Sequence, residues 1–198
     1  MQIIKLRNWQ NHYPNAAAWK SRAMRFANAR AVRISTRDGR EIDAIFSSHI
    51  ADEQGNLLSR MEPEQLQERR ACVLFHANAQ VALDMVESVR WYTRRGFEVL
   101  AITLGGYGES EGEACELTSY LDAEAALCFV TQCLSIPAHR VVLHGLSIGA
   151  ALAVAIGEQH PEVHLTLDQA FTNAGDVARF IVNSKVTRVL VGRQGGSP

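Results

Sequence analysis

One serine of this chain lies in a sequence that could make it a nucleophile. Residues 144–150 read HGLSIGA, so Ser147 occupies a Gly-x-Ser-x-Gly pattern that follows the apolar run 141–143 and precedes an alanine-rich segment. A serine on a sharp strand-to-helix turn exposes its hydroxyl, and small residues such as Gly145 and Gly149 let strand and helix approach closely. We predict that Ser147 attacks a carbonyl group. A glycine-containing helix start without catalytic duty is the alternative, whereas a phosphate loop or dinucleotide motif does not fit the sequence.

A second candidate segment, HANA at 76–79, directly follows the apolar run 72–75. Parallel sheets bind ligands beyond the carboxyl ends of their strands, so this loop and the Ser147 turn are expected at one edge. In acyl transfer a negative charge develops on the carbonyl oxygen, and backbone N–H groups of Ile148 and Asn78 would stabilise it. We interpret His76 as a structural residue that holds the loop.

The elements that must position these residues follow an alternating pattern. Short apolar runs of strand length are separated by segments with helical spacing, and parallel strands need a crossover that a helix supplies. The fold class predicted is α/β, with a mostly parallel sheet and helices on both faces. A glycine-rich segment, 105–112, either shapes a substrate entrance or is a plain flexible connection. The predicted strands are 72–75, 97–102, 141–143 and 163–167, and the predicted helices are 81–92, 121–129 and 150–156.

The N-terminal part differs from the rest in charge. The first 37 residues carry eight basic residues and no acidic one, whereas the remainder holds 12 basic and 21 acidic residues. Helical spacing predicts a basic amphipathic helix over 16–27. Three roles are open for it: packing on the domain, contact with an anionic membrane surface through residues 15–28, or organelle targeting. Alternation around Asp38-Gly39 predicts an antiparallel hairpin over 31–47. Residues 51–70 are expected to form a surface loop. We divide the chain into a helical segment, 1–30, and a domain, 31–198.

Composition excludes several classes of protein. With 47% hydrophobic and 21% charged residues and a net charge of −1, the 198-residue chain is typical of a globular protein with one core. The cysteines form no CxxC pair, which indicates buried thiols in a reducing, cytoplasmic compartment rather than a metal site. No cofactor is expected, no nucleic-acid-binding motif is present, and neither a signal peptide nor a membrane span is predicted. The cysteines are Cys72, Cys115, Cys128 and Cys133.

Three segments in order resemble the serine hydrolases of the α/β-hydrolase superfamily. HANA, RRGFEVLAITLGGYGESEG and HGLSIGA are similar to that family's HGNA, GYNVLALDYRGYGxSxG and GxSxGG, and the resemblance covers about 32–176. It implies Ser147 as nucleophile and Asn78 and Ile148 as oxyanion donors. It also implies a small acyl-ester or acylated-protein substrate, as for esterases and acyl-protein thioesterases. Ala77 replaces a glycine of the family, which is expected to strain the loop, and residues 103–105 replace its Asp-Tyr-Arg.

The resemblance also shows what this sequence lacks. Family members carry a catalytic acid and then a histidine after the serine, but His160 and His164 are the only histidines that follow Ser147. Neither is expected in the late loop that carries the base, and His144 is expected to be fixed by sheet packing. Asp168 is at a position where some members have the acid, and Asp176 follows it. The family's C-terminal strands have no counterpart, although 188–191 could begin one.

From these features we expect a C-terminally shortened hydrolase domain that is inactive or weakly active by itself, because a serine needs a base to become a strong nucleophile. Two other hypotheses remain open. One is a non-catalytic binding module derived from a hydrolase, and the other is a domain whose sheet and histidine are completed by a partner chain.

Overall fold

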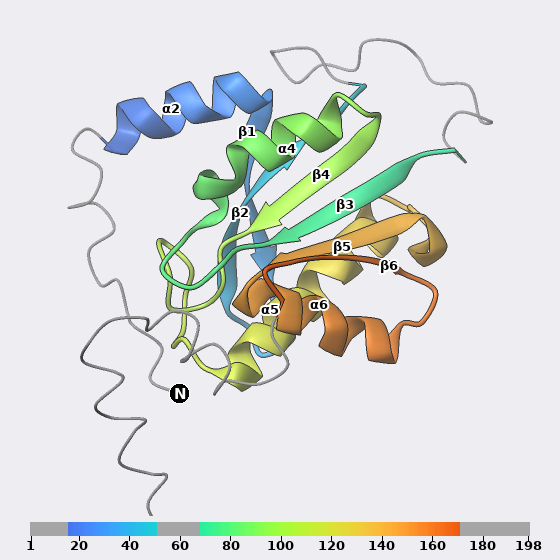
Figure 1. Cartoon of the computed structure of the whole chain (residues 1–198). Coiled ribbons are helices and arrows are strands. Elements are labelled where there is room, and N and C mark those ends of the chain that lie inside the picture. The colour runs from blue at the N-terminus through green and yellow to red at the C-terminus, as the bar shows by residue number, and fades with distance from the viewer. Residues whose placement is uncertain (1–15, 51–67, 171–198) are drawn as a thin grey trace, which may run out of the picture.

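A computed structural model describes residues 16–50 and 68–170. A six-stranded sheet forms its centre, in the order β1-β2-β4-β3-β5-β6 (Figure 1). β1 and β2 form an antiparallel hairpin and β2 is antiparallel to β4, whereas β4, β3, β5 and β6 run parallel. The predicted α/β class and the N-terminal hairpin are therefore confirmed. The strands are β1 Ala29–Ser35, β2 Glu41–Ser47, β3 Arg70–Phe75, β4 Phe97–Ile102, β5 Val141–Leu146 and β6 His164–Asp168.

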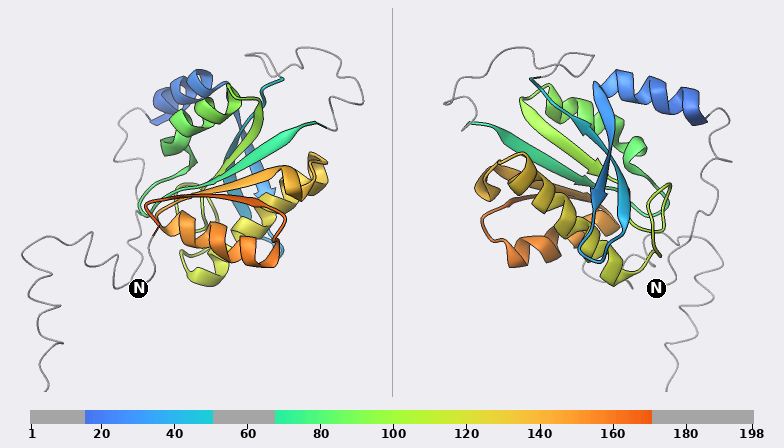
Figure 2. Two further views of the ribbon diagram at one scale, coloured as in Figure 1. Left: turned by 45° about the vertical axis from the view of Figure 1, so that its right-hand side comes forward. Right: turned by 180° about the vertical axis from the view of Figure 1, so that it is seen from behind.

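Helices cover both faces of this sheet. α2 and α4 lie on one face and α5 and α6 on the other (Figure 2). α4, α5 and α6 are the crossovers that consecutive parallel strands require, whereas α2 precedes the hairpin. The predicted helix 81–92 is divided into a 3-10 turn, Ala82–Met85, and α4, and the helix 121–129 begins earlier and ends in a π turn, Phe129–Cys133. The helices are α2 Ala16–Ala27, α4 Val86–Thr93, α5 Glu116–Cys128 and α6 Ile148–Gln159.

The central strands are buried on both faces, which explains their unbroken apolar runs. All residues of β3 after Arg70 are buried, and so are all residues of β4 after Phe97. β6 differs, because all five of its residues are exposed, including Leu165 and Leu167. The sheet thus holds β3 and β5 rigidly at its centre, where the candidate site residues follow.

The basic helix α2 packs against the domain. Ala23 and Ala27 are buried, whereas Arg22 and Arg25 are exposed. Lys20 forms an ion pair with Glu109 at 3.2 Å, and Arg90 of α4 lies 4.0 Å over the ring of Phe26. Packing explains the amphipathic pattern, and membrane contact through residues 15–28 stays a prediction.

The cysteine prediction is partly wrong. Cys72 is buried, but Cys115 and Cys133 are exposed, because they lie at the ends of the α5 segment rather than on its inner face. All four are free thiols.

Within 16–50 and 68–170, no helix is long and apolar enough to cross a membrane. The loop 51–70 lies mostly outside the described residues, as do Asp176 and the segment 188–191.

Candidate active site

Ser147 occupies the predicted strand-to-helix turn. It lies between β5 and α6 with φ 56° and ψ −112°, a conformation that L-residues rarely adopt. The turn leaves no room around its glycines: a Cβ on Gly145 would lie 2.0 Å from the carbonyl oxygen of Gly149, and one on Gly149 would lie 2.2 Å from the carbonyl oxygen of Phe75. Strained backbone of this kind persists where the surroundings enforce it, often at functional sites.

The HANA loop lies beside this turn. β3 and β5 are neighbours with Phe75 opposite Gly145, so residues 76–79 and Ser147 leave the sheet at the same edge. The start of α6 touches the end of β3 at Phe75, which brings the N-terminus of α6 and the loop into contact. Ser147, Ile148 and Asn78 are each half-buried and therefore accessible from solvent. The structure thus brings together the residues expected to hold a nucleophile and an oxyanion.

The loop does not carry the strain expected at Ala77. Among the described residues with positive φ, the one in this loop is Ala79, at 64°. Ala77 instead donates its backbone N–H to the side-chain oxygen of Gln80 at 3.1 Å, which closes the turn. The departure from glycine at this position is therefore accommodated without a left-handed backbone.

His76 holds the loop from inside the protein. Its side chain is fully buried, and its Nε2 accepts the backbone N–H of Leu104 at 3.0 Å. An accepting Nε2 carries no proton, so the proton is on Nδ1, which donates to the carbonyl of Ala77 at 2.7 Å. Burial lowers the pKa of His76 to about 4, more than its bond to Ala77 and the charge of Asp84 raise it. The structural interpretation of His76 agrees with this geometry.

We expect this histidine to make stability depend on pH. Its folded pKa of about 4 lies below the ordinary value of 6.5, so the unfolded chain binds a proton first as the pH falls. The contribution of neutral, buried His76 to the free energy of unfolding is therefore fully present above pH 6.5 and is lost as the pH falls toward 4. The difference between the two pKa values corresponds to about 3 kcal/mol. NMR titration checks this: the His76 ring signals should stay those of the neutral form until about pH 4. A midpoint near 6.5 would contradict the assignment.

Tyr107 connects the glycine-rich loop to the oxyanion loop. Its hydroxyl donates to Oδ1 of Asn78 at 2.8 Å, and its ring packs edge-on against His76 with centroids 5.1 Å apart. The ring is buried, and burial raises the Tyr107 pKa to about 12, so the hydroxyl keeps its proton. The Asn78 side chain is thus tied down, which orients the backbone N–H that would face an oxyanion.

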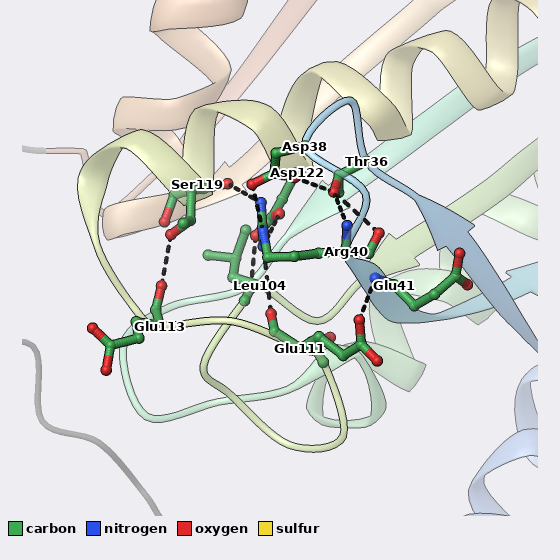
Figure 3. A network of polar contacts seen from close by, with 12 residues as sticks. Thr36, Asp38, Arg40, Glu41, Leu104, Glu111, Glu113, Ser119 and Asp122 are labelled. Atoms are coloured by element: carbon green, nitrogen blue, oxygen red, sulfur yellow. Dashed lines mark hydrogen bonds and ion pairs between the residues drawn. The ribbon is translucent and has the colours of Figure 1, made fainter.

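The glycine-rich loop is itself held by an ion-pair network (Figure 3). Arg40, just after the hairpin turn, pairs with the fully buried Asp122 of α5 at 2.9 Å and with Asp38 at 2.7 Å. Asp122 accepts the backbone N–H of Gly105 at 2.6 Å, and Arg40 donates to the carbonyl of Glu111 at 3.4 Å. Burial raises the pKa of Asp122, against the opposing effects of the Gly105 N–H and Arg40. The segment 105–112 is therefore anchored at both ends, unlike a plain flexible connection.

Replacing Tyr107 by phenylalanine is expected to loosen the oxyanion loop. Loss of one neutral hydrogen bond should lower the unfolding free energy by about 1 kcal/mol. It should also slow the reaction of Ser147 with a fluorophosphonate probe about fivefold. Tyr120→Phe is the matched control, because the Tyr120 hydroxyl bonds Glu116 on the exposed surface of α5. Urea denaturation and labelling rates measure both effects. Equal behaviour of the two variants would show that the Tyr107–Asn78 bond does not position the loop.

The candidate acid and bases are not assembled into a triad in the described part of the chain. The carbonyl of Asp168 accepts the backbone N–H of Ser147 at 2.9 Å, so Asp168 supports the turn through its backbone. The Asp168 carboxylate is exposed, and its charge raises the pKa of His144. Burial has the larger effect and lowers that pKa. His144 packs edge-on against Tyr92 with ring centroids 5.7 Å apart, as the prediction of fixed packing implies, and its Nδ1 has no hydrogen-bond partner within 16–50 and 68–170. His160 ends α6 and lies 3.7 Å from Glu162, whereas Nε2 of His164 is 3.1 Å from the carbonyl of His139.

Sequence reasoning missed the residues that position the site. Tyr107, Arg40 and Asp122 are polar or aromatic groups whose partners are far away in sequence, so no spacing rule reveals them. A weak signal did exist, since Asp122 is an acid among apolar residues of α5.

Known proteins are similar to this chain in sequence. Residues 67–172 match the family model described as serine aminopeptidase, S33. The chain is 28% identical over 120 residues to Protein bem46 of Schizosaccharomyces pombe, a match that covers 59% of this chain and 40% of that protein. It is 25% identical over 166 residues to an uncharacterized protein of Mycobacterium tuberculosis, covering 84% of this chain and 54% of the relative.

Solved structures give the same fold. An alpha-beta hydrolase from Vibrio vulnificus matches with a TM-score of 0.65 at 16% identity, over 93% of this chain and 62% of that one. The Pyrococcus furiosus esterase Pf2001 matches with a TM-score of 0.59 at 15% identity, over 83% of this chain and 59% of the esterase. The chain spans about half or less of the two curated relatives named above.

Proposed function

Because the chain belongs to the serine aminopeptidase, S33 family of α/β hydrolases, we propose that it carries the nucleophile and oxyanion half of a site for carboxylic esters or thioesters. Ser147 is the nucleophile, and the backbone N–H groups of Ile148 and Asn78 bind the oxyanion. The observation that carries this proposal is the strained Ser147 turn at the start of α6, packed directly against the end of β3, from which the HANA loop leaves the sheet. A non-catalytic module has no need of that strain.

The chemistry follows from this geometry. The Ser147 oxygen attacks the ester carbonyl carbon, and its proton passes to a base while the carbonyl oxygen takes the negative charge. Two N–H donors preorganised for that charge each contribute about 2.7–4 kcal/mol. Collapse of the tetrahedral intermediate expels the alcohol or thiol and leaves an acyl group on Ser147. Water then releases the acid.

The base is what limits this chain. In the described residues no histidine is hydrogen-bonded to Ser147, and the sequence after His164 contains none. Without a base to take the proton, both acylation and release are slow, and residual catalysis of about 10³–10⁴-fold over water is expected from the oxyanion hole and binding. We therefore propose that residues 1–198 are weakly active by themselves and that a base supplied from outside them would complete the site.

Hydrolysis of p-nitrophenyl acetate tests the proposal. The expected turnover lies far below the ordinary enzymatic range of about 1–10³ per second. The low rate that remains should be removed by Ser147→Ala. An ordinary enzymatic rate that Ser147→Ala abolishes would disprove the proposal that the chain lacks a catalytic base. A residual rate that is the same in Ser147→Ala would disprove the role of Ser147 and favour a binding module.

A further inference from the structure

A cavity opens at the edge of the sheet opposite Ser147. It has a volume of about 790 Å³ and lies at the amino ends of β3, β4, β5 and β6. These ends lie to the right in Figure 1, away from the Ser147 turn. Among the residues that the structure describes, its lining includes six basic side chains and one acidic one, Glu68. The basic residues are His49, Arg69, Arg70, His139, Arg140 and His164.

Behind the cavity wall lies a buried carboxylate. Glu98 of β4 is 1% exposed, and its Oε1 is 3.4 Å from both Nε of Arg69 and Nδ1 of His49. Neither oxygen has a hydrogen-bond partner in the described part of the chain. The carboxylate thus offsets the charge of Arg69, whose Nη1 also donates to the carbonyl of Leu134 at 3.1 Å. Arg69 and His49 are fixed in the wall by this contact.

The two other arginines are not offset in this way. Arg70 donates to the carbonyl of Arg95 at 2.6 Å and lies 4.4 Å over the ring of Phe97, contacts that orient its guanidinium without neutralising it. Arg140 has neither an ion pair nor a hydrogen bond through its side chain among the described residues. Within the described residues, these two guanidinium groups have no acidic partner, and both line one concave space, where field lines concentrate and anions are attracted.

We propose that this cavity is a binding site for a phosphate monoester, separate from the Ser147 site. Guanidinium groups bind phosphate oxygens through paired, charge-assisted hydrogen bonds, and the dianion matches the two unneutralised arginines. The histidines add N–H donors, and the cavity has room for an organic group attached to the phosphate. The ligand is a soluble phosphate ester or the headgroup of a phosphate-bearing lipid, since both present the same chemistry.

Titration with phenyl phosphate at constant ionic strength, followed by calorimetry, tests the site. The wild-type chain should bind one equivalent, and Arg140→Gln should weaken binding about tenfold or more, which is the loss of one charge-assisted contact. Arg140→Gln removes no contact within the described structure and should fold normally. Arg22→Gln, an exposed arginine of α2, is the matched control and should bind like the wild type.

A second arm distinguishes the two sources of the ligand. Vesicles containing phosphatidic acid should pellet the wild-type chain, and not Arg140→Gln, if the ligand is a lipid headgroup; no pelleting with retained phenyl phosphate binding indicates a soluble ester. Absence of saturable phenyl phosphate binding would overturn the proposal. Equal affinity of the wild type and Arg140→Gln would do the same, as would an equal loss in Arg22→Gln, because binding would then follow net charge alone.

Discussion

Gly149→Ala should lower the unfolding free energy by about 3 kcal/mol or more. A Cβ at this position would lie 2.2 Å from the carbonyl oxygen of Phe75 and 2.7 Å from its carbon, and backbone atoms of a central strand have no free direction in which to move. Relief requires the first turn of α6 to shift away from β3. That shift would separate the Ser147 turn from the HANA loop. Covalent labelling of Ser147 by a fluorophosphonate probe should therefore also be lost.

Gly157→Ala is the matched control, because Gly157 lies in the same helix. Its Cβ would be 3.0 Å from the side-chain end of Leu165, which is exposed and can change its rotamer. Alanine favours a helix over glycine by about 1 kcal/mol, so this variant should be neutral or slightly more stable. Urea denaturation followed by circular dichroism compares the two. A similar, small effect of both substitutions would mean that α6 does not press against β3.

Ser147→Ala should abolish reaction of the chain with a fluorophosphonate probe. Wild-type labelling is expected to be slow, because none of the described histidines is hydrogen-bonded to Ser147. Added imidazole should accelerate it about tenfold or more, less than the roughly 10²–10⁴-fold that a positioned general base provides. Ser135→Ala is the matched control: Ser135 also has a positive φ, 55°, but it precedes β5, whereas Ser147 follows that strand, so the substitution should leave labelling unchanged. If imidazole accelerates labelling of Ser147→Ala and wild type alike, the reactive group is another residue.

The fold could be predicted from the sequence because local patterns and the global arrangement agree. Continuous apolar runs indicated β3, β4 and β5 as strands, of which β3 and β4 are buried on both faces, and Asp38-Gly39 indicated the hairpin. Boundaries were less accurate where polar residues occupy helical turns, as at the start of α5. The exposed Cys115 and Cys133 show the same difficulty, since residue type alone does not specify which face of a helix end is covered.

The candidate site was predictable only in part. The Gly-x-Ser-x-Gly spacing reflects a local steric need, so the spacing alone was enough to place Ser147, Ile148 and the glycines at one turn. The support of the oxyanion loop is non-local. Tyr107 reaches Asn78 across 29 positions and Arg40 reaches Asp122 across more than twice that distance, so these contacts exist only after the sheet has formed.

Peptide mapping of the wild-type chain after treatment with the fluorophosphonate probe and imidazole shows whether Ser147 is the reactive residue. We propose that the strained turn and the HANA loop make Ser147 a preorganised nucleophile that lacks only its base. A single phosphonylated site, at Ser147, is expected. A chain that remains unmodified with imidazole present, or that is modified at another residue while Ser147 stays free, would contradict it.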